Sequence, residues 1–142
     1  MRIGTYKGCV ISVFLRDEHC PPHVHVRGTG WDARFRFSFL DDGVELWDVD
    51  PERRRPPGAV LLGICQALRQ RHYLARARRI WWEKIQTVCL ENHSWDWEAD
   101  EVVPGLVIRR GVYVIARARH DVAGRRTILN LVRAPGSVEI EL

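Results

Sequence analysis

The sequence HVHVRGTGWDARFRFSF, residues 23–39, decides the fold because it holds two alternating segments joined by a glycine turn. In the second segment one face is apolar and the other polar: Ala33, Phe35, Phe37 and Phe39 against Arg34, Arg36 and Ser38. Strict alternation of this kind is typical of a β-strand with one buried face. The glycine-rich turn at residues 28–30 lets the chain reverse. The stretch therefore predicts an antiparallel hairpin with one dry face.

Two neighbouring segments extend this hairpin into a meander. Residues 8–15, GCVISVFL, are rich in β-branched and aromatic side chains, which favour strands. Residues 44–47 follow the turn signal Asp41-Asp42-Gly43 and predict a fourth short strand. The first part of the chain is thus expected to be an antiparallel β-meander.

The hydrophobic period changes after a proline-rich loop at residues 50–57. Between residues 59 and 88 the apolar residues recur at helical spacing: Leu61, Ile64, Cys65, Leu68, Trp81, Trp82, Ile85 and Val88. This pattern predicts one long helix, or two helices broken near His72-Tyr73, packed on the meander. Residues 91–101 form an acidic connector with two tryptophans, and four strand-like segments follow: residues 106–108, 112–115, 127–132 and 137–140.

The order of strands, helix and strands predicts an α+β fold. A chain of 142 residues is the usual size of one domain, so we expect a single integrated domain over residues 1–142. Within it, residues 1–90 would form the β-α core and residues 91–142 a C-terminal β-meander.

Composition narrows the functional classes. With 46% hydrophobic and 28% charged residues the chain is expected to fold, and no apolar stretch is long enough to span a membrane. The start of the chain lacks a signal-peptide pattern, so a cytoplasmic location is expected. The four cysteines contain no C-x-x-C pair, which excludes a classical zinc finger and favours free thiols.

Arginine accounts for most of the net charge of +4, since only Lys7 and Lys84 are lysines among 22 basic residues. A GC-rich genome would produce this bias, and so would contact with phosphate groups, which the arginine fork binds well. We assign a candidate nucleic-acid surface to the arginines of the expected strand, loop and helix: Arg34, Arg36, Arg53, Arg54, Arg55, Arg76 and Arg79.

Residues 16–25, RDEHCPPHVH, form the densest polar cluster. His23 and His25 are two apart on an expected strand, so their imidazoles point to one face. Asp17 and His19 can fold back toward that face, while the two prolines stiffen the turn. Candidate metal ligands are His19, His23 and His25, which suit a divalent cation. The same three histidines with Asp17 are candidate acid–base residues, and a purely structural polar surface is the third alternative.

A resemblance to a known family rests on this cluster. The strand ending in Arg16-Asp17, the segment His19 to Val26 with its Pro-Pro-His-x-His-Val motif, Gly30, and Ala33-Arg34-Phe35 resemble the bacterial family called domain of unknown function 4160. The resemblance covers about residues 8–85 and leaves the C-terminal part unmatched. It implies a helix ending near tryptophans, here Trp81-Trp82, and a toxin–antitoxin-like gene neighbourhood. It assigns no chemistry to the histidines.

Three functions follow as hypotheses, and the sequence leaves open whether the protein is an enzyme. The first is a module of a toxin–antitoxin-like or mobile-element system that binds nucleic acid or a small protein partner. The second is a small histidine-dependent ribonuclease or phosphoesterase, with or without a divalent metal. The third is a protein-interaction inhibitor that acts through the C-terminal strands and the segment Trp95-Asp96-Trp97. A homodimer is compatible with each of them, and no membrane partner is expected.

Overall fold

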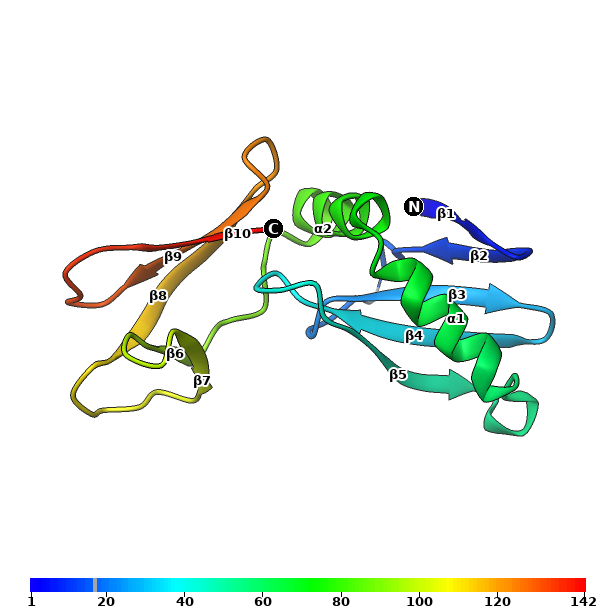
Figure 1. Cartoon of the computed structure of the whole chain (residues 1–142), viewed down its shortest axis with the longest axis horizontal. Helices are drawn as coiled ribbons and strands as arrows, with labels where there is room; N and C mark the ends of the chain where they lie inside the picture. Colours follow the sequence, from blue (N-terminus) through cyan, green and yellow to red (C-terminus); the bar gives the residue numbers. More distant parts are fainter. Residues whose placement is uncertain (17) are drawn as a thin grey trace. The chain divides into compact units, whose positions relative to one another are not determined.

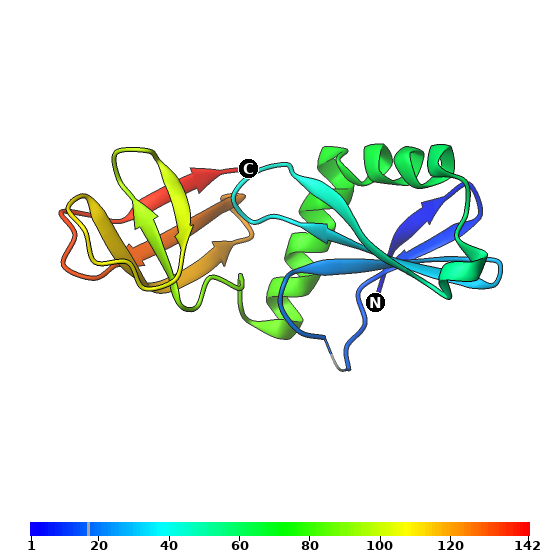
Figure 2. The same cartoon turned by 90° about the horizontal axis from the view of Figure 1, so that it is seen from below.

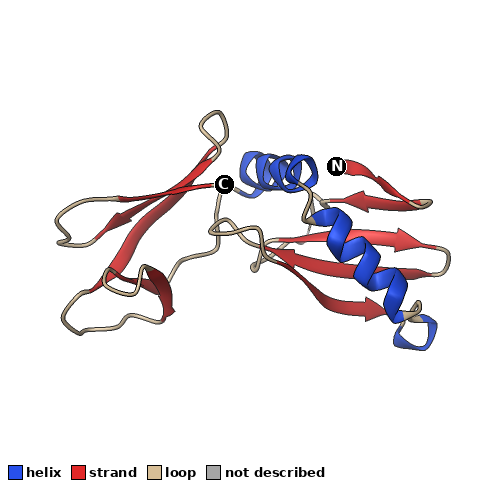
Figure 3. Cartoon of the chain, in the orientation of Figure 1, coloured by secondary structure: helices blue, strands red, loops and turns tan. Residues whose placement is uncertain are grey.

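The computed structural model of the protein describes residues 1–16 and 18–142. The described residues form ten β-strands in two antiparallel sheets and two α-helices (Figures 1 and 3). The expectation of an α+β fold is therefore wrong, and the fold is β-rich. The reason is that residues 87–142 add five strands and no helix within the described chain, while the helical segment is short.

The chain divides into two compact units, Met1–Gln86 and Thr87–Leu142. A single integrated domain over residues 1–142 stays a prediction. The first unit contains a sheet in the order β1-β2-β3-β4-β5. Its strands are β1 (Arg2–Tyr6), β2 (Cys9–Ser12), β3 (His23–Gly28), β4 (Trp31–Phe37) and β5 (Val44–Asp50). The expected hairpin of residues 23–39 is β3 and β4, whereas β1 was not predicted.

One face of this sheet is the core of the first unit. Val24 lies opposite Phe35 and Val26 opposite Ala33, and all four side chains are buried. The helices are η1 (Glu52–Arg54), α1 (Gly58–Leu68) and α2 (Arg71–Ile85). Figure 2 shows α1 along one side of the strands and α2 crossing behind them. Val24 and Leu74 line one small cavity between sheet and helices, so the helices cover the apolar face.

The helical segment is broken, as one of the two sequence alternatives predicted. The break falls at Arg69-Gln70 rather than at His72-Tyr73, because Gln70 is extended (φ −63°, ψ 135°) and directly precedes α2. The other face of β3 and β4 is polar, and α2 reaches it at His23, through the Trp81 ring. Its cross-strand pairs are His23 with Arg36, His25 with Arg34, and Arg27 with Asp32.

A β-bulge in β5 adds one more side chain near this polar face. Arg34 pairs with Asp48, but the next residue, Phe35, pairs with Leu46, so Trp47 is the extra residue. Bulges re-aim a side chain and are frequent beside functional sites. Here Trp47 lies against the Arg34 guanidinium, 4.3 Å from ring centroid to Cζ.

The second unit is a sheet in the order β10-β9-β8-β6-β7. Its strands are β6 (His93–Asp96), β7 (Glu101–Pro104), β8 (Val112–Asp121), β9 (Arg126–Leu131) and β10 (Val138–Glu141). Trp95, Ile115 and Leu129 are buried in it. The expected connector therefore contains β6, and the expected strand at residues 106–108 is an exposed loop in which Ile108 is 99% exposed.

The structure bears on two expectations from composition, those for membrane-spanning segments and for the cysteines. Among residues 1–16 and 18–142, no helix combines the length and the apolar character needed to cross a membrane. The expectation of free thiols holds for Cys9 and Cys65. It is wrong for Cys20 and Cys89, which are disulfide-bonded.

Candidate histidine–carboxylate site

The site is built on the first strand of the central hairpin. His23 and His25 alternate with the buried Val24 on β3, so both imidazoles lie on the polar face of the sheet. Their ring centroids are 5.3 Å apart. The alternation in the sequence predicts this placement, because side chains two apart on a strand share a face.

Glu18 completes the site from the loop that precedes β3. The backbone amide of Phe14 donates to Glu18 Oε1 at 3.1 Å, which turns the carboxylate toward the histidines. Glu18 Oε2 lies 2.6 Å from His23 Nε2, and Oε1 lies 3.5 Å from His25 Nε2. The carboxylate expected here was that of Asp17, which lies outside the described residues.

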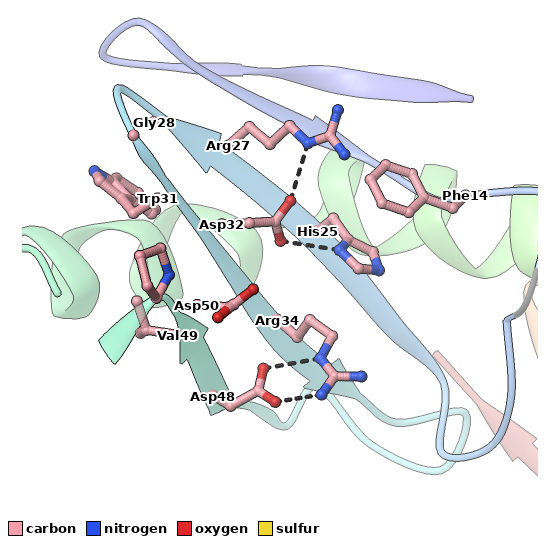
Figure 4. Close-up of a pocket in the computed structure, with 12 residues that line it drawn as sticks. Phe14, His25, Arg27, Gly28, Trp31, Asp32, Arg34, Asp48, Val49 and Asp50 are labelled. Carbon is pink, nitrogen blue, oxygen red and sulfur yellow. Dashed lines mark hydrogen bonds and ion pairs between the residues drawn. The ribbon is translucent and has the colours of Figure 1, made fainter. Parts of the chain in front are cut away.

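Each histidine is held in place through its other ring nitrogen. His23 Nδ1 lies 2.8 Å from the Pro21 carbonyl oxygen, and His25 Nδ1 lies 2.9 Å from Asp32 Oδ1. Asp32 also accepts a hydrogen bond from Arg27 Nε at 3.0 Å, as Figure 4 shows. Because the two acceptors take the protons on Nδ1, both Nε2 atoms are directed toward Glu18.

Burial and charge act in opposite directions on the two central groups. Burial disfavours the charged form of Glu18, but hydrogen bonds and charge from His23 and His25 outweigh it and lower its pKa to about 2. Burial likewise opposes protonation of His25. Asp32 and Glu18 outweigh it and raise the pKa of His25 to about 9. The two groups therefore form an ion pair at neutral pH.

Aromatic rings enclose the cluster. Phe14 stacks on His25 with 3.9 Å between ring centroids, and Trp81 of α2 meets His23 edge-on at 5.4 Å. The bulged Trp47 contacts another edge of His23 at 5.2 Å. The side chains of His23 and Glu18 are each only 2% exposed. The contact between His23 and Glu18 is thus shielded from water, which strengthens its electrostatic interaction.

His25 also lines an open groove of about 760 Å³ on the polar face. Figure 4 shows Asp32 between Arg27 and His25, and Arg34 paired with Asp48. The other lining residues are Phe14, Gly28, Gly30, Trp31, Val49, Asp50 and Pro51. The cluster is therefore accessible from the groove on the side of His25.

His19 lies beside the cluster but outside its centre. Its side chain is exposed, its Nδ1 is 3.1 Å from the Cys20 carbonyl oxygen, and its ring centroid is 5.8 Å from that of His23. The groups whose ligand atoms all lie within 4.8 Å of one another are those of Glu18, His23 and His25. These three residues could hold a metal ion. Sequence reasoning missed Glu18: the polar cluster of residues 16–25 signals a carboxylate here, but it does not separate Glu18 from Asp17.

The candidate nucleic-acid arginines fall into two groups. Arg34, Arg36 and Arg55 form ion pairs with Asp48, Glu45 and Glu52. The remaining four are exposed and form no ion pair within the described part of the chain: Arg53, Arg54, Arg76 and Arg79. These four lie on η1 and α2, whereas Arg34 and Arg36 lie on β4.

The expected family motif lies within the first unit. His23, His25 and Val26 are in β3, and Ala33 and Phe35 are in β4. The resemblance to domain of unknown function 4160 stays a prediction. Comparisons of the chain with protein-family models, curated proteins and solved structures gave no match.

Proposed function

We propose that the protein hydrolyses phosphoester bonds at the site formed by Glu18, His23 and His25. The observation that carries the proposal is the meeting of a buried carboxylate and two oriented imidazoles at one side of an open groove. Sites of hydrolysis combine such titratable groups with cations that stabilise negative charge.

Two cationic groups of the groove suit a phosphate. In the metal-free protein His25 is protonated at neutral pH, because its pKa is about 9. Arg27 uses only Nε to bind Asp32, and its side chain is 62% exposed. Its terminal nitrogens make no other hydrogen bond among the described residues, so they remain available to a phosphate oxygen. A small phosphodiester or an RNA strand fits this chemistry.

The proposal is tested by hydrolysis of bis(4-nitrophenyl) phosphate and of a short single-stranded RNA. We expect His25→Ala to reduce kcat/KM by at least about 100-fold, the usual effect of removing a general acid or base. His93→Ala is the matched control, because His93 lies in the second unit and its Nδ1 faces the Glu91 carbonyl. Equal rates for wild type and His25→Ala would refute the proposal.

A second candidate is a nucleic-acid-binding module, as expected for a toxin–antitoxin-like or mobile-element system. The supporting observation is the exposure of Arg53, Arg54, Arg76 and Arg79 without ion pairs in the described chain. Unpaired arginines bind phosphates without first losing a carboxylate partner. An inhibitor that acts through the C-terminal strands has less support, since Trp95 is buried and only Trp97 of that pair is exposed.

A further inference from the structure

We infer that Glu18, His23 and His25 bind a divalent transition-metal ion, for which zinc is the best match. The role of the ion in hydrolysis rests on the proposed function, whereas its binding does not. Three observations carry the inference: the spacing of the ligand atoms, the orientation of the imidazoles, and a buried carboxylate oxygen that lacks a regular hydrogen bond.

The candidate ligand atoms of Glu18, His23 and His25 lie close together in the metal-free protein. One nitrogen from each imidazole and one Glu18 oxygen lie within 4.8 Å of one another. In a tetrahedral zinc site with bonds of 2.0–2.1 Å, ligand atoms are about 3.3 Å apart. Glu18 Oε2 lies 2.6 Å from His23 Nε2 and Glu18 Oε1 lies 3.5 Å from His25 Nε2, so each imidazole already has a carboxylate oxygen near this spacing.

The imidazoles have the orientation of metal ligands. Each Nδ1 faces an acceptor outside the centre, the Pro21 carbonyl for His23 and Asp32 for His25. When a metal ion displaces the second proton of His25, the protons that remain on Nδ1 leave both Nε2 lone pairs directed at the centre. Metal-bound histidines usually have this arrangement, with a carbonyl or carboxylate behind the ring.

One of the two Glu18 oxygens lacks a regular hydrogen bond in the centre. This oxygen, Oε2, is fully buried and makes no hydrogen bond of regular geometry, although it lies 2.6 Å from His23 Nε2. A buried acceptor without a hydrogen bond is costly. With both imidazoles neutral, two lone pairs and a carboxylate would face one another, so the centre requires a cation. That cation is either a proton on an imidazole or a metal ion.

The donor set determines the class of ion. Two imidazoles and one carboxylate, without sulfur, are a ligand set of catalytic zinc sites that leaves a fourth position for water. His25 is the ligand that also lines the groove, so a substrate would reach the ion from that side. A zinc ion there would lower the pKa of a bound water and supply the nucleophile for hydrolysis.

The test uses the full chain, stripped with a chelator and titrated with Co²⁺, whose visible absorption reports tetrahedral coordination. We expect one Co²⁺ per chain, displaced by Zn²⁺. Glu18→Gln keeps the size of the side chain and should weaken Co²⁺ binding by at least about 100-fold, as should His25→Ala. His19→Ala is the control: it removes the adjacent exposed imidazole and should leave the affinity unchanged.

Circular dichroism of each variant separates loss of the site from loss of the fold. The inference is overturned if the wild type shows no cobalt band, or if Glu18→Gln binds as tightly as wild type. Metal binding without hydrolysis would support the inference and refute the proposed function. Hydrolysis that survives complete removal of metal would overturn the role of the ion and retain the proposed function.

Discussion

Two single residues, Glu18 and His25, make the free energy of unfolding of the metal-free protein depend on pH. His25 has a folded pKa of about 9 against an ordinary 6.5, so its contribution is complete below pH 6.5 and is lost as pH rises toward 9. Glu18 has a folded pKa of about 2 against 4.5, so its contribution is complete above pH 4.5 and is lost as pH falls toward 2. Asp32 and Arg27 supply the other charges beside His25, and His23 is in contact with Glu18.

We therefore predict that the free energy of unfolding is greatest between about pH 4.5 and 6.5. Urea unfolding in chelator across the pH range measures this. His25→Ala should flatten the loss between pH 6.5 and 9, whereas the control His93→Ala should keep it. An unchanged alkaline limb in His25→Ala would contradict the ion pair.

Asp32 is expected to set the metal affinity through His25, because its Oδ1 lies 2.9 Å from His25 Nδ1. Partners behind a ligand typically contribute 10–100-fold to affinity. We predict that Asp32→Asn weakens Co²⁺ binding by about 10–100-fold. Asp50→Asn is the matched control, since Asp50 lines the same groove and forms no ion pair among the described residues. Equal Co²⁺ affinities for the two variants would show that Asp32 does not increase the metal affinity through His25.

The sequence predicts part of this site and not the rest. Alternation along β3 is a local property, so it places His23 and His25 on one face without any knowledge of the tertiary structure. The carboxylate depends on the path of the loop before β3, which is shaped by contacts such as the Phe14 ring on His25. No pattern in the sequence distinguishes Glu18 from its neighbour Asp17 for this position.

At the scale of elements, α2 links the core to the site through Trp81. Its side chain is fully buried and meets Phe37 and His23 edge-on. We predict that Trp81→Ala lowers the free energy of unfolding by about 3–5 kcal/mol, as for other large buried aromatic residues. Trp82→Ala, on the adjacent half-buried position, should cost clearly less. Urea unfolding measures the free energy of unfolding of both variants. Equal decreases in the two variants would count against this role of Trp81 in packing.

There are physical reasons why the sequence does not predict some elements of the fold. The bulge at Trp47 exists only in the register between β4 and β5, which local alternation does not encode. β6 lies in an acidic segment with little strand character, and its pairing with β7 and β8 supplies the backbone hydrogen bonds. Residues 106–108 are apolar, but they form no strand, and Leu106 and Ile108 are exposed. Five strands in the second unit make the whole chain β-rich.

At the scale of the whole molecule, the net charge says less about which arginines can bind phosphate than the pattern of ion pairs does. The sequence counts an excess of four positive charges but cannot tell which arginines are already neutralised. Arg34 and Arg36 have carboxylate partners on the adjacent strand, Asp48 and Glu45. These partners come from β-sheet register and are therefore known only from the fold.

If the protein also binds RNA, the exposed arginines of α2 should account for the salt dependence. Each contact with a single-strand phosphate contributes about 0.7 to the slope of log affinity against log salt. We predict that Arg76→Gln with Arg79→Gln lowers the slope by about 1.4, measured by fluorescence anisotropy of a labelled RNA. The double variant Arg34→Gln and Arg36→Gln is the control of equal charge, and it should lower the slope less, because both guanidinium groups are engaged by Asp48 and Glu45. A larger loss in the control would place the phosphate contacts on the sheet and join RNA binding to the groove beside His25.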